Sequence, residues 1–118
     1  MTHEEKKVAK IVEELTMYFF AVGGDHMESG IERDGNHVTI KFRSNYHPYY
    51  RERLHNLEQY LNEPKIDGIE DIYWELAGSG DPGETSQLLL VGMMIDKAEI
   101  DLKEEVVELR LYKELLEV

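Results

Sequence analysis

The segment LLLVGMMIDKAEIDLKEEVVELRLYK (88–113) constrains the fold more than any other part of the chain. It can form a buried strand followed by one long helix, or a helix followed by a hairpin of KAEIDL and VVELRLYK. Apolar and charged residues alternate on both sides of KEE, which is the period of a strand. A helical stripe is also present, at Leu102, Val106, Leu109 and Leu116. Both structures stay open on this pattern alone, and the hairpin is the better fit to the whole chain.

The composition limits the class of protein. The chain has 118 residues, enough for one domain (1–118) with a single core, and it is 42% hydrophobic and 32% charged. Its formal charge of −12 would repel a phosphate backbone, so a nucleic-acid partner is not expected. No apolar run approaches the roughly 18 residues that span a bilayer, and the start has no signal-peptide layout. With no cysteine present, we expect a cytoplasmic protein without membrane contact.

The amino-terminal residues predict an amphipathic helix. Apolar residues recur at spacings of three and four between Val8 and Val22, which places them on one helical face. Thr2 and Glu5 have the spacing of a capping box, and the two glycines that follow Val22 supply the end.

Two alternating runs after this helix predict a hairpin. The pair Asp34 and Gly35 lies between the runs, and both residue types tolerate the positive φ that a tight turn needs. A turn at these two residues sets Ile31 opposite Val38 and Met27 opposite Phe42. This register keeps the apolar residues of both strands on one face of the sheet.

The middle of the chain predicts a second helix and a short strand. Helical spacing runs from Tyr46 to Asn62, and the proline of NEPK ends it. Residues Ile69–Ala77 are typical of a strand, and the glycine-containing loop GSGDPGE (78–84) follows.

The resulting order of helix, hairpin, helix, strand, glycine loop, helix and hairpin resembles the histidine-kinase-type ATPase (GHKL or Bergerat) superfamily, and most closely its small bacterial anti-sigma-factor serine kinases. EELTMYFFAVGG lies at the family's box helix, HVTIKFRSN at the strand before its first glycine box, GSGDPGE at its second, and VVELRLYK at its last strand. The resemblance implies an α+β fold. It predicts a two-layer α/β sandwich with a mixed, mostly antiparallel sheet packed on about three helices.

The resemblance also locates the nucleotide-binding positions, and most of them are altered. Glu14 stands at the family's box Glu, but Tyr18 replaces the Asn that coordinates magnesium, and Ser44 replaces the Asp that binds adenine. We therefore expect a degenerate site with no cofactor, no metal and no catalytic residue. The vestigial positions are Glu14, Tyr18, Ser44, Asn45, Gly78, Gly80 and Gly83.

The stretch NYHPYYRERLHNLEQY (45–60) is rich in tyrosine and arginine, the residue types enriched in protein interfaces. Its candidate partner-binding residues are Tyr46, Tyr49, Tyr50, Arg51, Arg53 and Tyr60. The alternative is a half-buried helix whose tyrosines cover a sheet edge.

These patterns predict a non-catalytic regulatory or protein-binding domain, similar to an anti-sigma factor that has lost its nucleotide anchors. The resemblance implies a protein partner and a homodimer. One alternative is a nucleotide-binding serine kinase that uses Glu14 and the loop from Gly78 to Gly83 in an atypical site. Another is an unrelated α+β domain.

Overall fold

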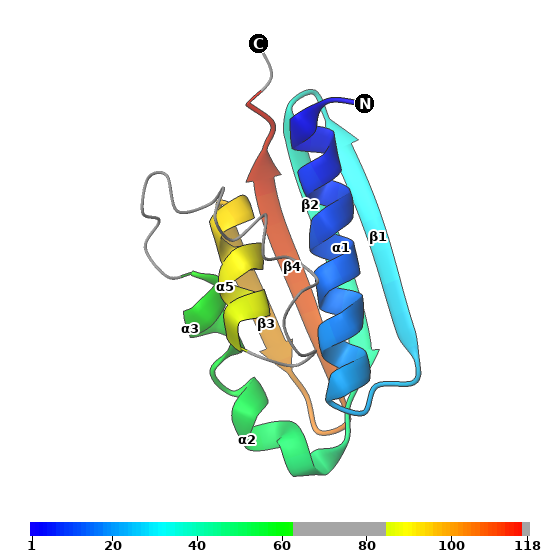
Figure 1. The fold of residues 1–118 in the computed structure, drawn as a ribbon. Helices are drawn as coiled ribbons and strands as arrows, with labels where there is room; N and C mark the ends of the chain where they lie inside the picture. The colour runs from blue at the N-terminus through cyan, green and yellow to red at the C-terminus, as the bar shows by residue number, and fades with distance from the viewer. Residues whose placement is uncertain (63–84, 117–118) are drawn as a thin grey trace.

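A computed structural model describes residues 1–62 and 85–116 of the chain (Figure 1). The described helices are α1 (His3–Ala21), the 3₁₀ helix η1 (Pro48–Tyr50), α2 (Arg51–Leu54), α3 (Leu57–Leu61) and α5 (Thr85–Met94). The described strands are β1 (Met27–Asp34), β2 (His37–Asn45), β3 (Lys97–Leu102) and β4 (Val106–Glu114). The fold is α+β, as expected.

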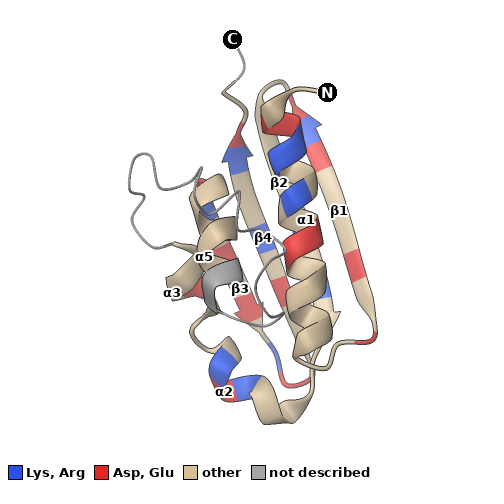
Figure 2. Cartoon of the chain, viewed as in Figure 1, with Lys and Arg blue, Asp and Glu red and all other residues tan. Residues whose placement is uncertain are grey.

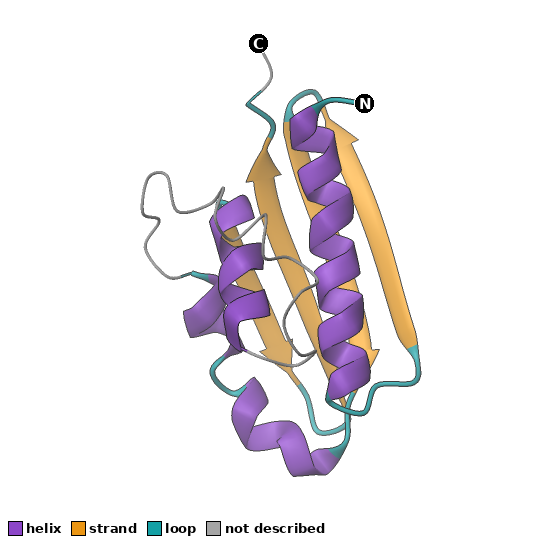
Figure 3. Ribbon diagram, in the orientation of Figure 1, coloured by secondary structure: helices purple, strands orange, loops and turns teal. Residues whose placement is uncertain are grey.

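The strands form one sheet in the order β1-β2-β4-β3, and every described pairing is antiparallel. Two hairpins are therefore joined through their inner strands, β2 and β4. Helices α1 and α5 lie side by side on one face of the sheet, and no described helix covers the other face (Figure 3). This arrangement is compatible with a two-layer sandwich. The strand expected at Ile69–Ala77 lies outside the described residues.

The carboxy-terminal segment forms a helix and a hairpin, so the long-helix alternative is wrong. Alternate residues of β4 are buried from Val107 to Lys113, while their neighbours are half-buried or exposed. The amide of Lys103 donates to the carbonyl of Val106 at 2.8 Å and closes the turn. The segment therefore forms strands despite the helical propensity of KEE, because alternation along β4 buries the whole apolar face of this strand.

Helix α1 begins with the expected capping box. The backbone amide of Thr2 donates to Glu5 Oε1 at 2.8 Å, and the amide of Glu5 donates to Thr2 Oγ1 at 3.1 Å. Gly23 ends the helix with φ of +90°, a conformation that glycine adopts without steric cost.

The β1–β2 hairpin forms, but its predicted register is wrong by two residues. The turn lies at Gly35 and Asn36, with a φ of +62° at Gly35, and Ile31 faces Ile40 instead of Val38. Glycine at the first central position satisfies a type II′ turn, which needs a positive φ only at this glycine, whereas a type I′ turn at residues 34 and 35 would need one at Asp34 as well. Because the shift is an even number of residues, every side chain keeps its predicted face.

The helix expected from Tyr46 to Asn62 is broken into η1, α2 and α3. Pro48 has no amide hydrogen to donate, so it begins η1 instead of continuing a helix. A second break follows α2, where the Asn56 amide donates to the carbonyl three residues earlier in a tight turn. The bend allows Leu54, Leu57 and Leu61 all to reach the core.

Helices α3 and α5 approach closely at Gly92. A Cβ atom at this position would lie 2.9 Å from the carbonyl oxygen of Leu61 and 3.0 Å from that of Tyr60. Only glycine allows this approach without moving the backbone of α3, so Gly92 helps to place α3 beside the sheet.

Candidate functional site

The two positions on α1 at which the resemblance predicts nucleotide contacts are buried inside the molecule. Glu14 and Tyr18 lie one turn apart on the inner face of the helix, and each is 1% exposed. Lys10 Nζ lies 3.2 Å from the Glu14 carboxylate. Burial lowers the pKa of Lys10, but its hydrogen bonds to Glu13 and Glu14 outweigh burial and raise the pKa above its usual value. The carboxylate is thus held beside a charged amine on its own helix.

Tyr18 places a phenol where the family has an asparagine amide. Its hydroxyl is buried and makes no hydrogen bond to any residue that the structure describes. Burial raises the pKa of Tyr18 to about 12, more than the positive charge of Arg53 lowers it. At neutral pH the side chain is therefore a neutral phenol that can donate a hydrogen bond. It lacks the carbonyl ligand that magnesium prefers.

At the end of β2, the two residues that the resemblance predicts for nucleotide binding, Ser44 and Asn45, make side-chain hydrogen bonds to nearby residues. Ser44 Oγ donates to the carbonyl of Asn45 at 2.7 Å. Asn45 Oδ1 accepts the amides of Asp25 and His26 at 2.9 and 3.0 Å, and its Nδ2 donates to the Asp25 carboxylate. The Asn45 side chain therefore fixes the connection between α1 and β1. Gly78, Gly80 and Gly83 lie outside the described residues.

Two of the six predicted partner-binding residues hold the β3–β4 turn. The Tyr46 hydroxyl bonds to the carbonyl oxygens of Lys103 and Glu104 at 2.6 and 2.8 Å. Arg51 Nη1 donates to the same two carbonyls at 2.8 and 3.2 Å and to the Tyr46 hydroxyl. Tyr46 is buried, so these two side chains serve the fold at this position.

Three of the remaining candidates, Tyr49, Tyr50 and Arg53, form an aromatic surface together with His47; Tyr49, Arg53 and His47 are exposed, and Tyr50 is half-buried. Tyr49 is 80% exposed, and its ring meets the Tyr50 ring edge-on at 5.0 Å. Tyr50 is flanked by the His47 ring at 6.4 Å and by the Arg53 guanidinium at 5.2 Å. His47 Nδ1 accepts the amide of Tyr49. Tyr50 and Tyr60 are both half-buried and pack against the core, as the alternative interpretation expects for a tyrosine.

The uncovered sheet face has a charged concavity that the sequence did not predict. It has a volume of about 580 Å³. Its charged lining residues are Glu28, Lys41, Arg43, Glu99, Asp101, Glu108 and Arg110. Arg43 Nε lies 3.6 Å from Glu108 Oε1 on the neighbouring strand. Alternation in each strand signals a polar face, but only the strand order brings these side chains together.

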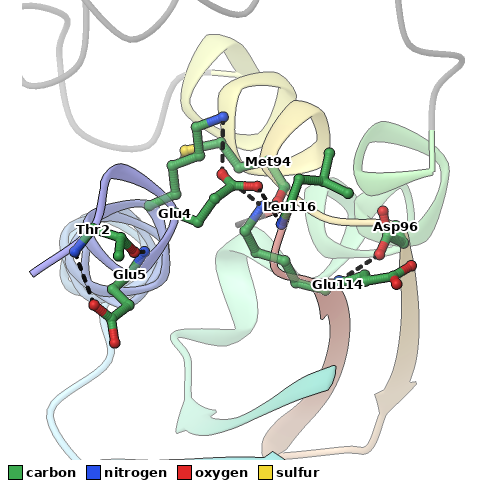
Figure 4. Close-up of polar contacts among 9 residues, drawn as sticks. Thr2, Glu4, Glu5, Met94, Asp96, Glu114 and Leu116 are labelled. Atoms are coloured by element: carbon green, nitrogen blue, oxygen red, sulfur yellow. Dashed lines mark hydrogen bonds and ion pairs between the residues drawn. The ribbon is translucent and has the colours of Figure 1, made fainter. Parts of the chain in front are cut away.

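A buried ion pair joins α1 to the end of β4 (Figure 4). Lys113 Nζ donates to the carbonyl of Met94 at 2.7 Å and lies 3.7 Å from Glu4 Oε2. The backbone amide of Leu116 donates to Glu4 Oε1 at 2.9 Å. Burial alone would raise the pKa of Glu4, but the Leu116 amide and the charges of Lys113 and Lys7 lower it below its usual value.

Comparison with known proteins adds no family assignment. No protein-family model matches the chain, and no curated protein is similar to it in sequence. Within residues 1–62 and 85–116, no helix is long and apolar enough to cross a membrane. The same residues contain no group of three or more His, Cys, Asp or Glu side chains arranged to hold a metal ion.

Proposed function

We propose that this chain is a non-catalytic regulatory domain that binds another protein, with a fold like that of the histidine-kinase-type ATPases and without their nucleotide anchors. The altered positions support the loss of nucleotide binding. Tyr18 is a buried phenol, and the side chains of Ser44 and Asn45 are engaged with their own neighbours. None of these three side chains is free to meet adenine or magnesium.

The observation that carries the proposal is the aromatic surface. Tyr49 exposes a large ring that contacts the Tyr50 ring, and the cap at His47 fixes the Tyr49 backbone amide. A braced tyrosine loses little conformational entropy on binding, and tyrosine and arginine dominate the energetics of many interfaces. A partner that covers this surface would gain a large contact area at small entropic cost.

Site-specific photocrosslinking tests this surface. We would place p-benzoylphenylalanine at position 49 in the full chain and irradiate cells that express it. The control carries the same group at Glu58, an exposed position on the neighbouring helix α3. We expect a discrete protein adduct from position 49 that is absent from position 58. Absence of an adduct at 49, or the same adducts from both positions, would refute the aromatic surface as the contact site.

A thermal-shift titration with ATP and ADP, with and without magnesium, tests the loss of nucleotide binding. A ligand at about 100 times its dissociation constant stabilises a fold by roughly 2.7 kcal/mol. We expect no shift up to millimolar nucleotide. A saturable shift that disappears in Glu14→Ala would replace our proposal with the nucleotide-binding alternative.

A further inference from the structure

Among the described strands, β1 lies at an edge of the sheet, and no described strand pairs with one side of its backbone. The amide of Asn45 donates to the carbonyl of His26, and hydrogen-bonded pairs alternate along an antiparallel ladder. Residues 28, 30, 32 and 34 therefore bond to β2. Met27, Ser29 and Ile31 point their N–H and C=O groups away from the sheet, where no described residue meets them.

The opposite edge shows that this exposure is not a general property of the sheet. On β3 the outward amide of Ala98 donates to Asn62 Oδ1 at 2.9 Å, and its carbonyl accepts Asn62 Nδ2 at 3.0 Å. The asparagine side chain takes the place of a neighbouring strand. No equivalent side chain lies along β1 among the described residues, and every β1 residue after Met27 is exposed.

The side chains of β1 define what could pair with it. Glu28 and Glu32 lie on the uncovered sheet face, with the small Gly30 between them. Their side chains are still 67% and 71% exposed beside His26 and Lys41. Figure 2 shows acidic residues at several places along β1. Ile31, on the helix-covered face, is 53% exposed. An incoming strand would place its own residues beside these, in the same alternation.

We propose that β1 binds an extended segment of another protein as an added strand, and that Lys or Arg residues alternate with apolar residues in this segment. The basic residues would lie beside Glu28 and Glu32, and an apolar residue beside Ile31. Main-chain hydrogen bonds to Ser29 and Ile31 would supply affinity, and the side chains would supply selectivity. The charge of −12 on the chain would attract a basic segment at long range.

A second copy of this chain fits the same edge less well. Antiparallel pairing of two β1 strands about Gly30 would set Glu28 of each copy opposite Glu32 of the other, on the same face of the sheet. Like charges directly opposite each other destabilise a pair of strands. The proposal is independent of the aromatic surface, because Tyr49 lies on η1 and contributes nothing to β1.

Amide hydrogen exchange of the full chain with a synthetic peptide tests the proposal. The probe is acetyl-Thr-Lys-Val-Thr-Val-Lys-Thr-amide, whose pattern reads the same in a parallel or an antiparallel orientation. We expect the peptide to slow exchange at Ser29 and Ile31 at least tenfold and to leave Ala98 unchanged. A peptide with Glu in place of Lys should have no effect at the same concentration.

Charge-reversed variants test the selectivity without removing any backbone group. Glu28→Lys with Glu32→Lys should weaken binding of the Lys peptide at least tenfold. The matched control, Glu99→Lys with Asp101→Lys, changes the same uncovered face beside the other edge and should leave binding unchanged. Tyr49→Ala should also leave it unchanged, so that failure of this proposal is distinguishable from failure of the aromatic surface.

Three results would overturn the inference. The first is unchanged exchange at Ser29 and Ile31 with millimolar Lys peptide. The second is that the Lys and Glu peptides slow amide exchange equally, which would exclude a preference for a basic partner. The third is slow exchange at these amides without peptide that becomes slower as protein concentration rises, which would assign the edge to a second copy.

Discussion

The two edges of the sheet differ in how they end. At β3 the backbone is covered by Asn62, the helix α3 packs beside the strand, and Tyr46 with Arg51 holds the turn into β4. At β1 no described residue covers the outer backbone groups, and the residues after Met27 are exposed. An exposed edge is a risk for aggregation, and charged residues such as those of β1 reduce that risk. In the part of the chain that the structure describes, Asn62 therefore closes one edge, and the other edge has no equivalent contact.

Neighbouring residues of α1 repeat the same contrast. Glu4 reaches toward β4 and meets Lys113 in the interior. Glu5 reaches toward β1 and lies 2.9 Å from Arg33, with both side chains more than a third exposed. Water screens the second pair and not the first, so the β3–β4 half of the sheet should depend much more on its polar contacts than the β1 half.

The largest effect is expected from Lys113→Met. The substitution removes one of the two lysines beside the buried Glu4 carboxylate and leaves Lys7 at 3.3 Å, so the loss of this buried partner should cost up to about 3 kcal/mol. Urea unfolding at pH 7 measures this cost. The control is Lys41→Met, which removes an exposed pair to Glu32 and should cost less than about 1 kcal/mol. Equal losses in both variants would contradict the contrast between the halves.

Asn62→Ala should be the next most disruptive change. It removes two hydrogen bonds and leaves the amide and carbonyl of Ala98 without partners at a partly buried site, which costs about 2 kcal/mol. Asn56→Ala is the matched control, because the Asn56 side chain makes no capping hydrogen bond to α3. Amide exchange at Ala98 should accelerate in the first variant and not in the second. Unchanged exchange at Ala98 would show that Asn62 does not close this edge.

A smaller loss is expected from Tyr46→Phe. The ring stays in the core, but the carbonyls of Lys103 and Glu104 lose a hydroxyl donor, and Arg51 continues to bond to both. The cost should be about 1 kcal/mol by thermal or urea unfolding. Tyr49→Phe, on the exposed ring of the same segment, should change stability by less than about 0.5 kcal/mol. A larger loss from Tyr49→Phe would mean that the aromatic surface is part of the fold.

The sequence predicted the parts of the fold that depend on local periodicity. The capping box at Thr2 and the alternation of both hairpins are local patterns, and their elements formed. The predicted register of β1 is wrong because Gly35 can occupy either central position of a two-residue turn, and the observed turn confines the positive φ to this glycine. The single helix predicted from Tyr46 is wrong because Pro48 begins a separate 3₁₀ helix and a tight turn at Asn56 separates α2 from α3.

The contacts that close the β3 edge had weaker signals. Lys113 falls on the apolar face of β4 by simple alternation, so a buried partner could have been expected, but nothing in the sequence identifies Glu4. Asn62 and Ala98 are 36 residues apart, and their contact requires both the bend after α2 and the strand order. The candidate partner-binding tyrosines differ in burial for the same reason. Their residue type predicts an interface, but tertiary contacts determine that Tyr46 is buried and Tyr49 is exposed.

Acid should weaken the closed half through Glu4. The pKa of this carboxyl is lowered in the folded state, so its contribution to stability is complete above the unfolded-state pKa, near the ordinary value of 4.5, and is lost as pH falls through the folded-state pKa. Wild type should therefore lose stability more steeply than Glu4→Gln below this pH in urea unfolding series. Glu58→Gln, exposed on α3, serves as the control and should follow wild type. If the free energy of unfolding fell equally with pH in wild type and Glu4→Gln, Glu4 would not contribute to the loss of stability in acid.

The smallest effect is expected on β1 itself. Ile31 and Ile100 occupy matching places, since each lies on an edge strand and points to the helix-covered face. Ile100 packs against the core, whereas Ile31 is 53% exposed. Ile31→Thr should change the free energy of unfolding by less than about 0.5 kcal/mol, and Ile100→Thr should cost more than about 1 kcal/mol because a hydroxyl replaces packed methyl groups. If Ile31→Thr cost as much as Ile100→Thr, the isoleucine on β1 would be needed for folding, and its exposure would no longer indicate a surface kept for a partner.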